Sequence, residues 1–248
     1  MKQFGLIGYP LGHSFSKKYF TQKFENEKIN SKYELYELPS IEDFVELKSI
    51  DTLYGLNVTI PYKEQVIPYL DELDQTAEAI GAVNVIKFIR KGESLHLKGY
   101  NSDAIGFENS LKPLLKAEHN KALILGTGGA SKAIDYTLRK LGIETKFVSR
   151  TAKDGVLSYQ DLNQSIIDDY LVIVNASPVG TFPHVDECPS IPYEFLTPNH
   201  VLFDAVYNPA ETLFLKKGKK VGCSCLNGEL MLIGQAEEAW QIWNNESH

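Results

Sequence analysis

Short apolar runs of strand length alternate with amphipathic helical stretches along nearly the whole chain, and no other feature limits the fold as strongly. The alternation predicts an α/β fold with a largely parallel sheet, because a helix between two strands returns the chain for parallel pairing. Strands are expected over 3–8, 33–38, 54–60, 82–88, 94–100, 122–125, 144–149, 170–175, 201–205 and 220–224. Helices are expected over 15–29, 41–47, 104–115, 132–141 and 230–243.

Length and pattern together favour two domains. The chain has 248 residues, and at about 150 residues per domain this is room for one large domain or two small ones. A second strand–helix series starts at Lys121. We therefore place a first domain over 1–103, a second over 104–226, and a final segment, 227–248, that returns to the first.

Composition argues against several classes of protein. Lys and Arg number 25 and Asp and Glu 32, so the net charge is −7, which opposes binding to nucleic acid or to an anionic membrane. No apolar run approaches the roughly 20 residues of a membrane helix, and the first apolar stretch is too short for a signal peptide. We expect a protein that binds neither nucleic acid nor membrane.

The three cysteines, Cys188, Cys223 and Cys225, are too few for a disulfide framework, and their number is odd. They indicate a reducing compartment, which we take to be the cytoplasm. Cys223 and Cys225 are expected on one face of a late strand, as small apolar residues rather than metal ligands. No metal site is predicted.

Residues 126–131, with the sequence GTGGAS, form a glycine-rich turn directly after an expected strand and at the start of an expected helix. Gly126 permits the tight turn, and Gly128 lets the backbone approach a pyrophosphate, which then lies at the helix N-terminus. Ser131 stands where the dinucleotide pattern has its third glycine. The context still favours a Rossmann-type dinucleotide site over a plain tight turn.

The end of the next expected strand distinguishes NAD from NADP. An NAD enzyme has Asp or Glu there, which binds the ribose 2′-hydroxyl. This strand ends in Ser149-Arg150-Thr151, without a carboxylate. A guanidinium suits a phosphate and the two hydroxyls add donors, so the sequence predicts NADP. The alternative is that Arg150 is a solvated surface residue.

Polar residues follow several expected strands of the first half, at the sheet edge where α/β proteins bind ligands. Lys63 lies just past one strand end and Asp103 past another, and a lysine beside a carboxylate can hold and pass a proton. Ser14 and Ser16 follow the first strand at a helix start, where hydroxyls suit a carboxylate. Taken singly, each serine is more readily a helix cap, and Lys63 is more often a solvated charge.

A set of motifs spans nearly the whole chain in one order. They are HSFS at 13–16, NVTIPYK at 57–63, GAVN at 81–84, YNSDAIG at 100–106, GTGGA at 126–130, DAVYNPAET at 204–212 and MLIGQA at 231–236. In sequence and order these motifs resemble those of the shikimate dehydrogenase family. The resemblance implies two domains: an N-terminal α/β substrate domain with a mostly parallel sheet, and a Rossmann-type domain that binds NADP.

The resemblance also implies an activity and a role for each motif. The family reduces 3-dehydroshikimate to shikimate with NADPH, on the path to chorismate and the aromatic amino acids. Lys63 and Asp103 match its catalytic pair; which of them is the formal acid stays open. Substrate binding is implied for Ser14, Ser16, Thr59, Asn84, Tyr207 and Gln235. Cofactor binding is implied for Gly126, Thr127, Gly128, Gly129, Ala130, Ser149, Arg150 and Thr151. We expect a monomer or homodimer.

Two departures from the family pattern affect particular contacts. Ser149 stands where the family usually has Asn, which weakens the expected NADP contact, and Leu230 stands where it often has glycine near the nicotinamide. Two rival functions stay open: a relative that also oxidises quinate or prefers NAD, and a dinucleotide-binding regulatory protein that has lost the chemistry. The presence of both Lys63 and Asp103 argues against the second rival.

Overall fold

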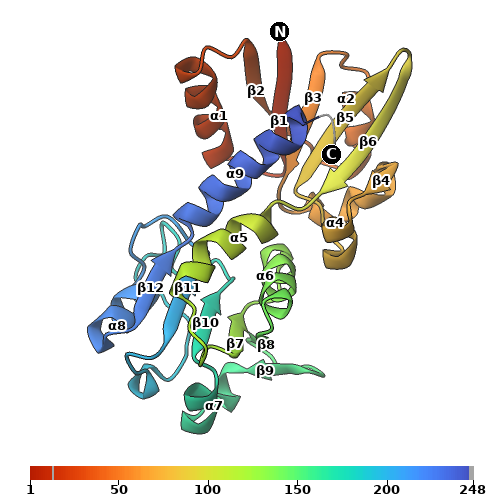
Figure 1. Cartoon of the computed structure of the whole chain (residues 1–248). Coiled ribbons are helices and arrows are strands. Elements are labelled where there is room, and N and C mark those ends of the chain that lie inside the picture. The colour runs from red at the N-terminus through yellow and green to blue at the C-terminus, as the bar shows by residue number, and fades with distance from the viewer. Residues whose placement is uncertain (13, 246–248) are drawn as a thin grey trace. The chain divides into compact units, whose positions relative to one another are not determined.

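The computed structural model describes residues 1–12 and 14–245, so that His13 of the first motif lies outside the described residues. The chain forms two compact units, Met1–Ser102 with Gln235–His248, and Asp103–Gly234. Each contains one sheet flanked by helices (Figure 1), which confirms the predicted α/β fold. The assignment of substrate binding to one unit and cofactor binding to the other stays a prediction.

The first unit is built on a six-stranded sheet in the order β2-β1-β3-β5-β6-β4. Its strands are β1 (Lys2–Gly8), β2 (Ser31–Glu37), β3 (Leu53–Val58), β4 (Glu72–Leu73), β5 (Val85–Lys91) and β6 (Ser94–Tyr100). Its helices are α1 (Phe15–Asn26), α2 (Phe44–Leu47), α3 (Tyr62–Gln65) and α4 (Gln75–Ile80), with the greater part of α9 (Glu229–Asn244). The sheet is mixed, because β5 runs antiparallel to β3 and β6 while the other pairs are parallel.

Helices α1 and α9 cover one face of this sheet, and an aromatic cluster holds them there. Phe20 and Phe24 of α1 pack with Phe4 of β1 and Trp243 of α9. The Trp243 indole nitrogen also donates to the Ile86 carbonyl oxygen at 3.1 Å. The last helix is therefore fixed to the sheet by both packing and a hydrogen bond.

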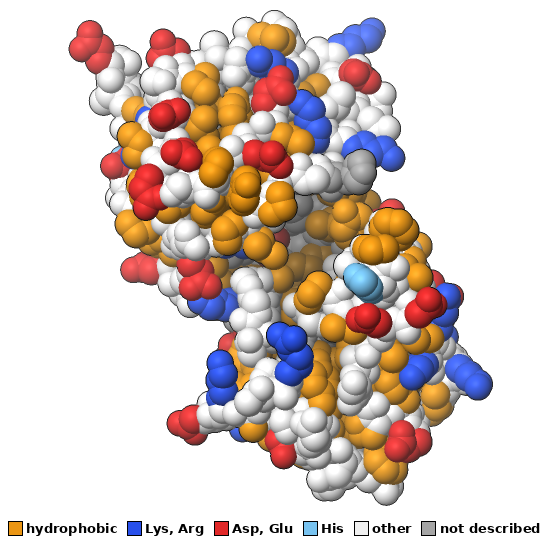
Figure 2. Space-filling view, turned by 180° about the vertical axis from the view of Figure 1, so that it is seen from behind, with side chains coloured by type: hydrophobic (Ala, Val, Ile, Leu, Met, Phe, Trp, Pro, Cys, Tyr) orange, Lys and Arg blue, Asp and Glu red, His pale blue; other side chains and the backbone are white. Residues whose placement is uncertain are grey.

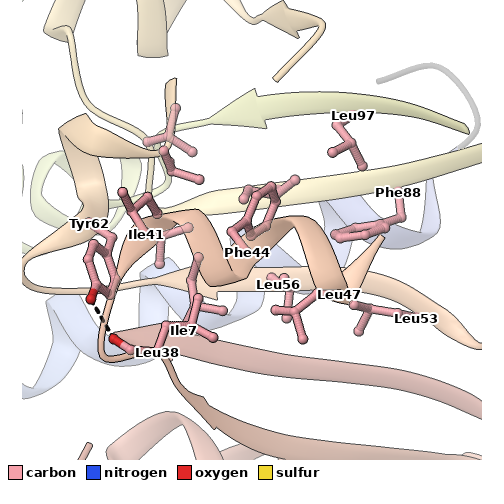
Figure 3. Close-up of a cluster of buried hydrophobic side chains, with 14 of the residues drawn as sticks. Ile7, Leu38, Ile41, Phe44, Leu47, Leu53, Leu56, Tyr62, Phe88 and Leu97 are labelled. Carbon is pink, nitrogen blue, oxygen red and sulfur yellow. Dashed lines mark hydrogen bonds between the residues drawn. The ribbon is translucent and has the colours of Figure 1, made fainter. Parts of the chain in front are cut away.

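The opposite face packs against α2, α3 and α4. Figure 3 shows Phe44 of α2 over the strand residues of a second apolar cluster, with Leu56 among them. At the edge of this cluster the Tyr62 hydroxyl donates to the Leu38 carbonyl oxygen, drawn there as a dashed line. Because Lys63 follows Tyr62 directly, this buried ring anchors the short helix that carries Lys63.

The second unit contains a six-stranded, all-parallel sheet in the order β12-β11-β10-β7-β8-β9. Numbered within the unit and started from β9, this is 3-2-1-4-5-6, the strand order of a Rossmann dinucleotide-binding sheet. Its strands are β7 (Lys121–Leu125), β8 (Glu144–Ser149), β9 (Val156–Ser158), β10 (Val172–Asn175), β11 (Val201–Asp204) and β12 (Ser224–Asn227). Its helices are α5 (Asp103–Leu111), α6 (Gly129–Lys140), α7 (Gln164–Asp169) and α8 (Leu213–Val221).

Both faces of the second sheet are buried. In β7, Ala122 and Ile124 pack toward α5 and α6, whereas Leu123 and Leu125 pack toward α7 and α8. A parallel strand covered on both sides reads as a continuous apolar run, which is why β7 carries no polar alternation. The carboxyl ends of these strands therefore form the edge that stays accessible to a ligand.

One predicted strand is wrong. Residues 220 and 221 belong to the end of α8, which stops at Gly222 with a φ of +93°. The strand β12 begins only at Ser224, so Cys223 precedes it and does not share a strand face with Cys225. The Cys223 and Cys225 thiols donate to backbone carbonyl oxygens, at 3.3 and 3.6 Å.

Within residues 1–12 and 14–245, no helix combines the length and the apolar character that crossing a bilayer requires. On the face shown in Figure 2, Lys and Arg side chains lie scattered among acidic and apolar ones. This face carries no broad basic area of the kind that binds a phosphate backbone.

Candidate active site

The first sheet aligns the ends of the two strands that precede the predicted catalytic residues. Asn57 of β3 lies opposite Val85 of β5, and Val85 lies opposite Tyr100 of β6. Because β3 and β6 are both antiparallel to β5, their carboxyl ends point to the same edge. Lys63 follows β3 and Asp103 follows β6, so the segments that carry them leave the sheet at one edge.

Backbone contacts fix both segments locally. The Lys63 carbonyl oxygen accepts a hydrogen bond from the Val83 amide at 2.7 Å, and the Lys63 side chain is half-buried. Asp103 follows Ser102 directly, begins helix α5 and is 7% exposed. A carboxylate in the first turn of a helix is stabilised by the positive end of the helix dipole. The Lys63 backbone is thus fixed to Val83, and Asp103 is buried in the first turn of α5.

Asn84 connects the strands at this edge. Its side-chain oxygen accepts from the Ser102 amide at 2.7 Å, its side-chain nitrogen donates to the Ser102 hydroxyl at 3.1 Å, and its carbonyl oxygen accepts from Val58 at 2.8 Å. The side chain is 3% exposed. These bonds hold the amide in one orientation, which is what a group that binds a ring hydroxyl requires.

Ser14 is the N-cap of α1, and its hydroxyl oxygen accepts from the Lys17 amide at 3.2 Å. Ser14 therefore caps the helix, as the alternative interpretation of the sequence predicts. It does not exclude carboxylate binding, because a hydroxyl that accepts one bond still has its own proton to donate.

Ser16 belongs to a chain of buried hydrogen bonds that the sequence did not predict. It bonds to Tyr33, whose hydroxyl donates to the Asn57 side-chain oxygen at 2.7 Å; the Asn57 side-chain nitrogen approaches the Asn84 carbonyl oxygen at 3.4 Å. Burial raises the pKa of Tyr33 well above its usual value, and the bond from Ser16 opposes that rise. The one sequence signal was a polar Asn57 at the end of an apolar strand.

Thr59 and Gln235 complete the predicted substrate residues of the first unit. The Thr59 amide donates to the Ile7 carbonyl oxygen at 2.9 Å, which places Thr59 at the end of β1. Gln235 is 7% exposed on α9. Glu237, further along the same helix, accepts from the Tyr19 hydroxyl and from Lys23, at 3.1 Å from the latter's ammonium. These contacts tie the helix that carries Gln235 to the helix that Ser14 caps.

In the second unit, the glycine-rich turn has the geometry that its sequence predicts. Gly126 has a φ of +108°, and a Cβ atom there would lie 3.2 Å from Ser177. Gly128 is the N-cap of α6, and a Cβ atom there would meet nothing within 4 Å. Ser131 replaces the third glycine without disruption, because its hydroxyl donates to the Gly128 carbonyl oxygen at 2.6 Å. The backbone beside Gly128 is open to a phosphate.

The end of β8 presents one cation. The Ser149 hydroxyl donates to the Thr151 carbonyl oxygen, so it shapes the turn itself. Arg150 and Thr151 are exposed beside it. The loop between β11 and α8 carries Tyr207, which is 39% exposed, and Leu230 near the start of α9 is 53% exposed. In the described part of the chain, no group of three or more His, Cys, Asp or Glu could hold a metal ion.

Comparison with known proteins decides the family. Residues 6–86 match the model of the shikimate dehydrogenase substrate binding domain. Shikimate dehydrogenase (NADP(+)) of Methanococcus maripaludis is 37% identical over 259 residues, which cover 98% of this chain and 91% of that protein. This chain belongs to the shikimate dehydrogenase family. The family prediction is thereby confirmed over nearly the full length.

Solved structures of the shikimate dehydrogenase family and its relatives have the same fold. The Thermus thermophilus enzyme, crystallised with NADP(H) and shikimate, matches with a TM-score of 0.85 and 29% identity over 98% of this chain and 94% of that one. Quinate dehydrogenase from Corynebacterium glutamicum, in complex with NAD, matches with a TM-score of 0.87 and 25% identity over 98% and 93%. The fold alone therefore does not separate shikimate from quinate, or NADP from NAD.

Proposed function

We propose that this chain catalyses the reversible reduction of 3-dehydroshikimate to shikimate with NADPH. The observation that carries the proposal is the aligned sheet edge, from which the segments with Lys63 and Asp103 both depart, in a member of the shikimate dehydrogenase family. The NADP(+)-dependent relative from M. maripaludis and the complex of the T. thermophilus enzyme support the choice of substrate and cofactor.

The second unit fits a dinucleotide that carries a 2′-phosphate. The open backbone at Gly128 and the start of α6 suit the pyrophosphate, and Arg150 at the end of β8 suits the additional phosphate. NADPH, when bound, supplies the hydride. The residues proposed to hold it are 126–130 and 149–151.

Lys63 and Asp103 are proposed to manage the proton. When the substrate carbonyl is reduced, its oxygen gains negative charge and needs a proton. The Lys63 ammonium stabilises this charge, and the proton comes from Lys63, either directly or with Asp103 sharing it; a proton from solvent then restores the pair. In the reverse direction the same pair removes the proton from the shikimate hydroxyl.

The remaining residues of the first unit are proposed to orient the substrate ring. Ser14 and Ser16, at the start of α1, suit the carboxylate. Thr59, Asn84 and Gln235 suit the ring hydroxyls. Tyr207, on the loop after β11, is proposed to bind the substrate as well.

The test follows the absorbance of the reduced cofactor, NADPH or NADH, with four combinations of substrate and cofactor: shikimate or quinate, with NADP+ or NAD+. We expect the highest kcat/KM for shikimate with NADP+. A higher value for quinate or for NAD+ would support the corresponding rival instead. Binding of NADP+ without any turnover would support the regulatory protein.

We also propose that the enzyme is a cytoplasmic monomer or homodimer that acts on a small molecule. The sparse cysteines, with buried Cys223 among them, support a reducing compartment. Sedimentation equilibrium would measure the assembly, and a species larger than a dimer would contradict the proposal.

A further inference from the structure

Asp204 is a fully buried carboxylate that the proposed mechanism does not use. It ends β11 and has no exposed surface. Its two oxygens accept from the Asn175 side chain at 2.9 Å, the Val206 amide at 3.0 Å and the Thr212 hydroxyl at 2.5 Å. Burial of an ionised group is costly unless donors surround it, so a site with three donors is built for a carboxylate.

One side of this site controls the segment that lies against the glycine-rich turn. Asn175 of β10 pairs with Asp204 in the sheet register, and its side-chain nitrogen also bonds to the Val179 carbonyl oxygen at 3.2 Å. Its side-chain oxygen accepts from the Ser177 amide at 3.1 Å and the Ser177 hydroxyl at 2.7 Å. Ser177 is the residue that a Cβ atom on Gly126 would meet at 3.2 Å. The position of Asn175 therefore determines where Ser177 packs against the glycine-rich turn.

The other side controls the loop that carries Tyr207. Val206 begins this loop and Thr212 ends it, and both donate to Asp204. The middle of the loop contacts the neighbouring segment, since the Asn208 carbonyl oxygen accepts from the Phe182 amide at 3.0 Å. With both of its ends bonded to one carboxylate, the loop has little freedom to move Tyr207.

We propose that Asp204 is a positioning residue that holds the glycine-rich turn, the segment 175–180 and the Tyr207 loop in one arrangement for cofactor and substrate. This inference rests on the proposed function only for the role of Tyr207. The effect on the dinucleotide turn follows from the contacts of Asn175 and Ser177. Asp204 acts through these neighbours and does not itself touch a reacting atom.

The test compares Asp204→Ala, Asp204→Asn and a control, Val201→Ala. Alanine leaves three buried donors without a partner, whereas asparagine keeps an oxygen for Asn175 and Val206. Val201 is buried at the opposite end of the same strand and touches none of the three donors. The dissociation constant of NADP+ is measured by calorimetry, and kcat and KM per folded molecule are measured by the NADPH assay.

We expect Asp204→Ala to raise the NADP+ dissociation constant and the KM for shikimate about tenfold each, corresponding to about 1.4 kcal/mol. Asp204→Asn should bring the NADP+ dissociation constant and the KM for shikimate most of the way back to their wild-type values. Val201→Ala should lower stability and leave both constants unchanged. Adding Tyr207→Phe to Asp204→Ala should cost less than Tyr207→Phe costs in the wild type, because the loop is already displaced.

Wild-type constants in folded Asp204→Ala would overturn the proposal, since the residue would then only stabilise the fold. If Asp204→Ala does not fold, Asn175→Ala takes its place, with the same expected rise and the same overturning result. A wild-type enzyme that does not oxidise shikimate would contradict the proposed function, while the NADP+ constant would still test the position of the dinucleotide turn.

Discussion

The two units place their candidate binding residues at the same kind of sheet edge but stabilise that edge by different chemistry. In the first unit, neutral amides and hydroxyls bond to one another, as in Asn84 with Ser102 and Tyr33 with Asn57. None of the described Asp and Glu side chains of the first unit is buried. In the second unit, a buried carboxylate, Asp204, is the centre of the network.

Because of this difference, we expect the two sheet edges to play different parts in ligand binding. A neutral network presents fixed donors and acceptors at every pH, which suits recognition of ring hydroxyls. A buried carboxylate can accept hydrogen bonds from several loops at once, which suits the arrangement of loops around a long cofactor. Because these bonds depend on the charge of the carboxylate, the arrangement is sensitive to its protonation. Changes in the first unit should therefore appear in turnover, and changes in the second in cofactor binding and pH-dependent stability.

The largest expected effect comes from the first edge. Lys63→Ala should lower kcat by about 100-fold or more, because it removes the charge and the proton source of the transition state. The NADP+ dissociation constant should stay unchanged, since the proposed cofactor residues lie in the other unit. Steady-state kinetics and calorimetry measure the two quantities, and near-normal kcat would remove Lys63 from the mechanism.

Asp103→Asn tests the partner of Lys63. The amide has nearly the shape of the carboxylate, so α5 should form, while proton exchange is lost and kcat falls by about 100-fold. Circular dichroism checks the fold. A folded variant with full activity would contradict the pairing of Lys63 with Asp103.

The regular elements of both units were predictable where one periodicity dominates. The strand over 144–149 has the predicted bounds, because β8 is flanked by clear turn residues. No helix was predicted over the residues of α8, which has Gly218 in its second half. In the structure, a Cβ atom at Gly218 would lie 2.2 Å from Leu202. Glycine there allows the helix to approach the sheet closely, and such a tertiary requirement leaves no periodic signal.

The sequence proposes the candidate site as single residues and does not indicate the hydrogen-bond network that joins them. Lys63 and Arg150 follow strand ends that the alternation locates. The bonds from Tyr33 to Asn57 and from Asn175 to Asp204 join residues far apart in the chain, and the one local sign of them is the polar Asn57 at the end of an apolar strand.

The third prediction compares how the stability contributed by each of the two sheet edges depends on pH. Burial raises the pKa of Asp204 to about 6 in the folded state, against about 3.9 for an unfolded aspartate. Between these pH values the folded chain keeps the Asp204 proton that the unfolded chain has lost. The contribution of Asp204 to the free energy of unfolding is therefore full at low pH and is lost as the pH rises through 6. From pH 4 to pH 7 the free energy of unfolding of the wild type should fall by about 2 kcal/mol relative to that of Asp204→Asn.

Urea denaturation at several pH values measures this difference. Asn84→Ala is the control from the first edge, because it removes neutral hydrogen bonds only. Its stability difference from the wild type should stay constant between pH 4 and pH 7. A wild type and an Asp204→Asn variant with parallel pH curves would contradict the account of the second edge.

The fourth prediction concerns the cofactor. Arg150→Ala should raise the KM for NADP+ about tenfold and leave that for NAD+ nearly unchanged, since a charge-assisted bond to a phosphate is worth about 1.5 to 3 kcal/mol. We expect the low end of this range, because the Ser149 hydroxyl bonds to Thr151. Equal weakening of both cofactors would show that Arg150 does not bind the 2′-phosphate.

The smallest expected effect distinguishes a structural cap from a binding group. Ser14 caps α1 in the first unit and Asn163 caps α7 in the second, each through a side-chain oxygen that accepts an amide. Replacing either residue by alanine should cost about 1 kcal/mol of stability. The two variants are therefore matched in their effect on the fold. Only Ser14→Ala should also raise the KM for shikimate, by severalfold, because its hydroxyl proton is proposed to reach the substrate carboxylate. If both variants keep the wild-type KM, Ser14 is a cap and nothing more, and carboxylate binding at this edge falls to Ser16 and the amides of α1.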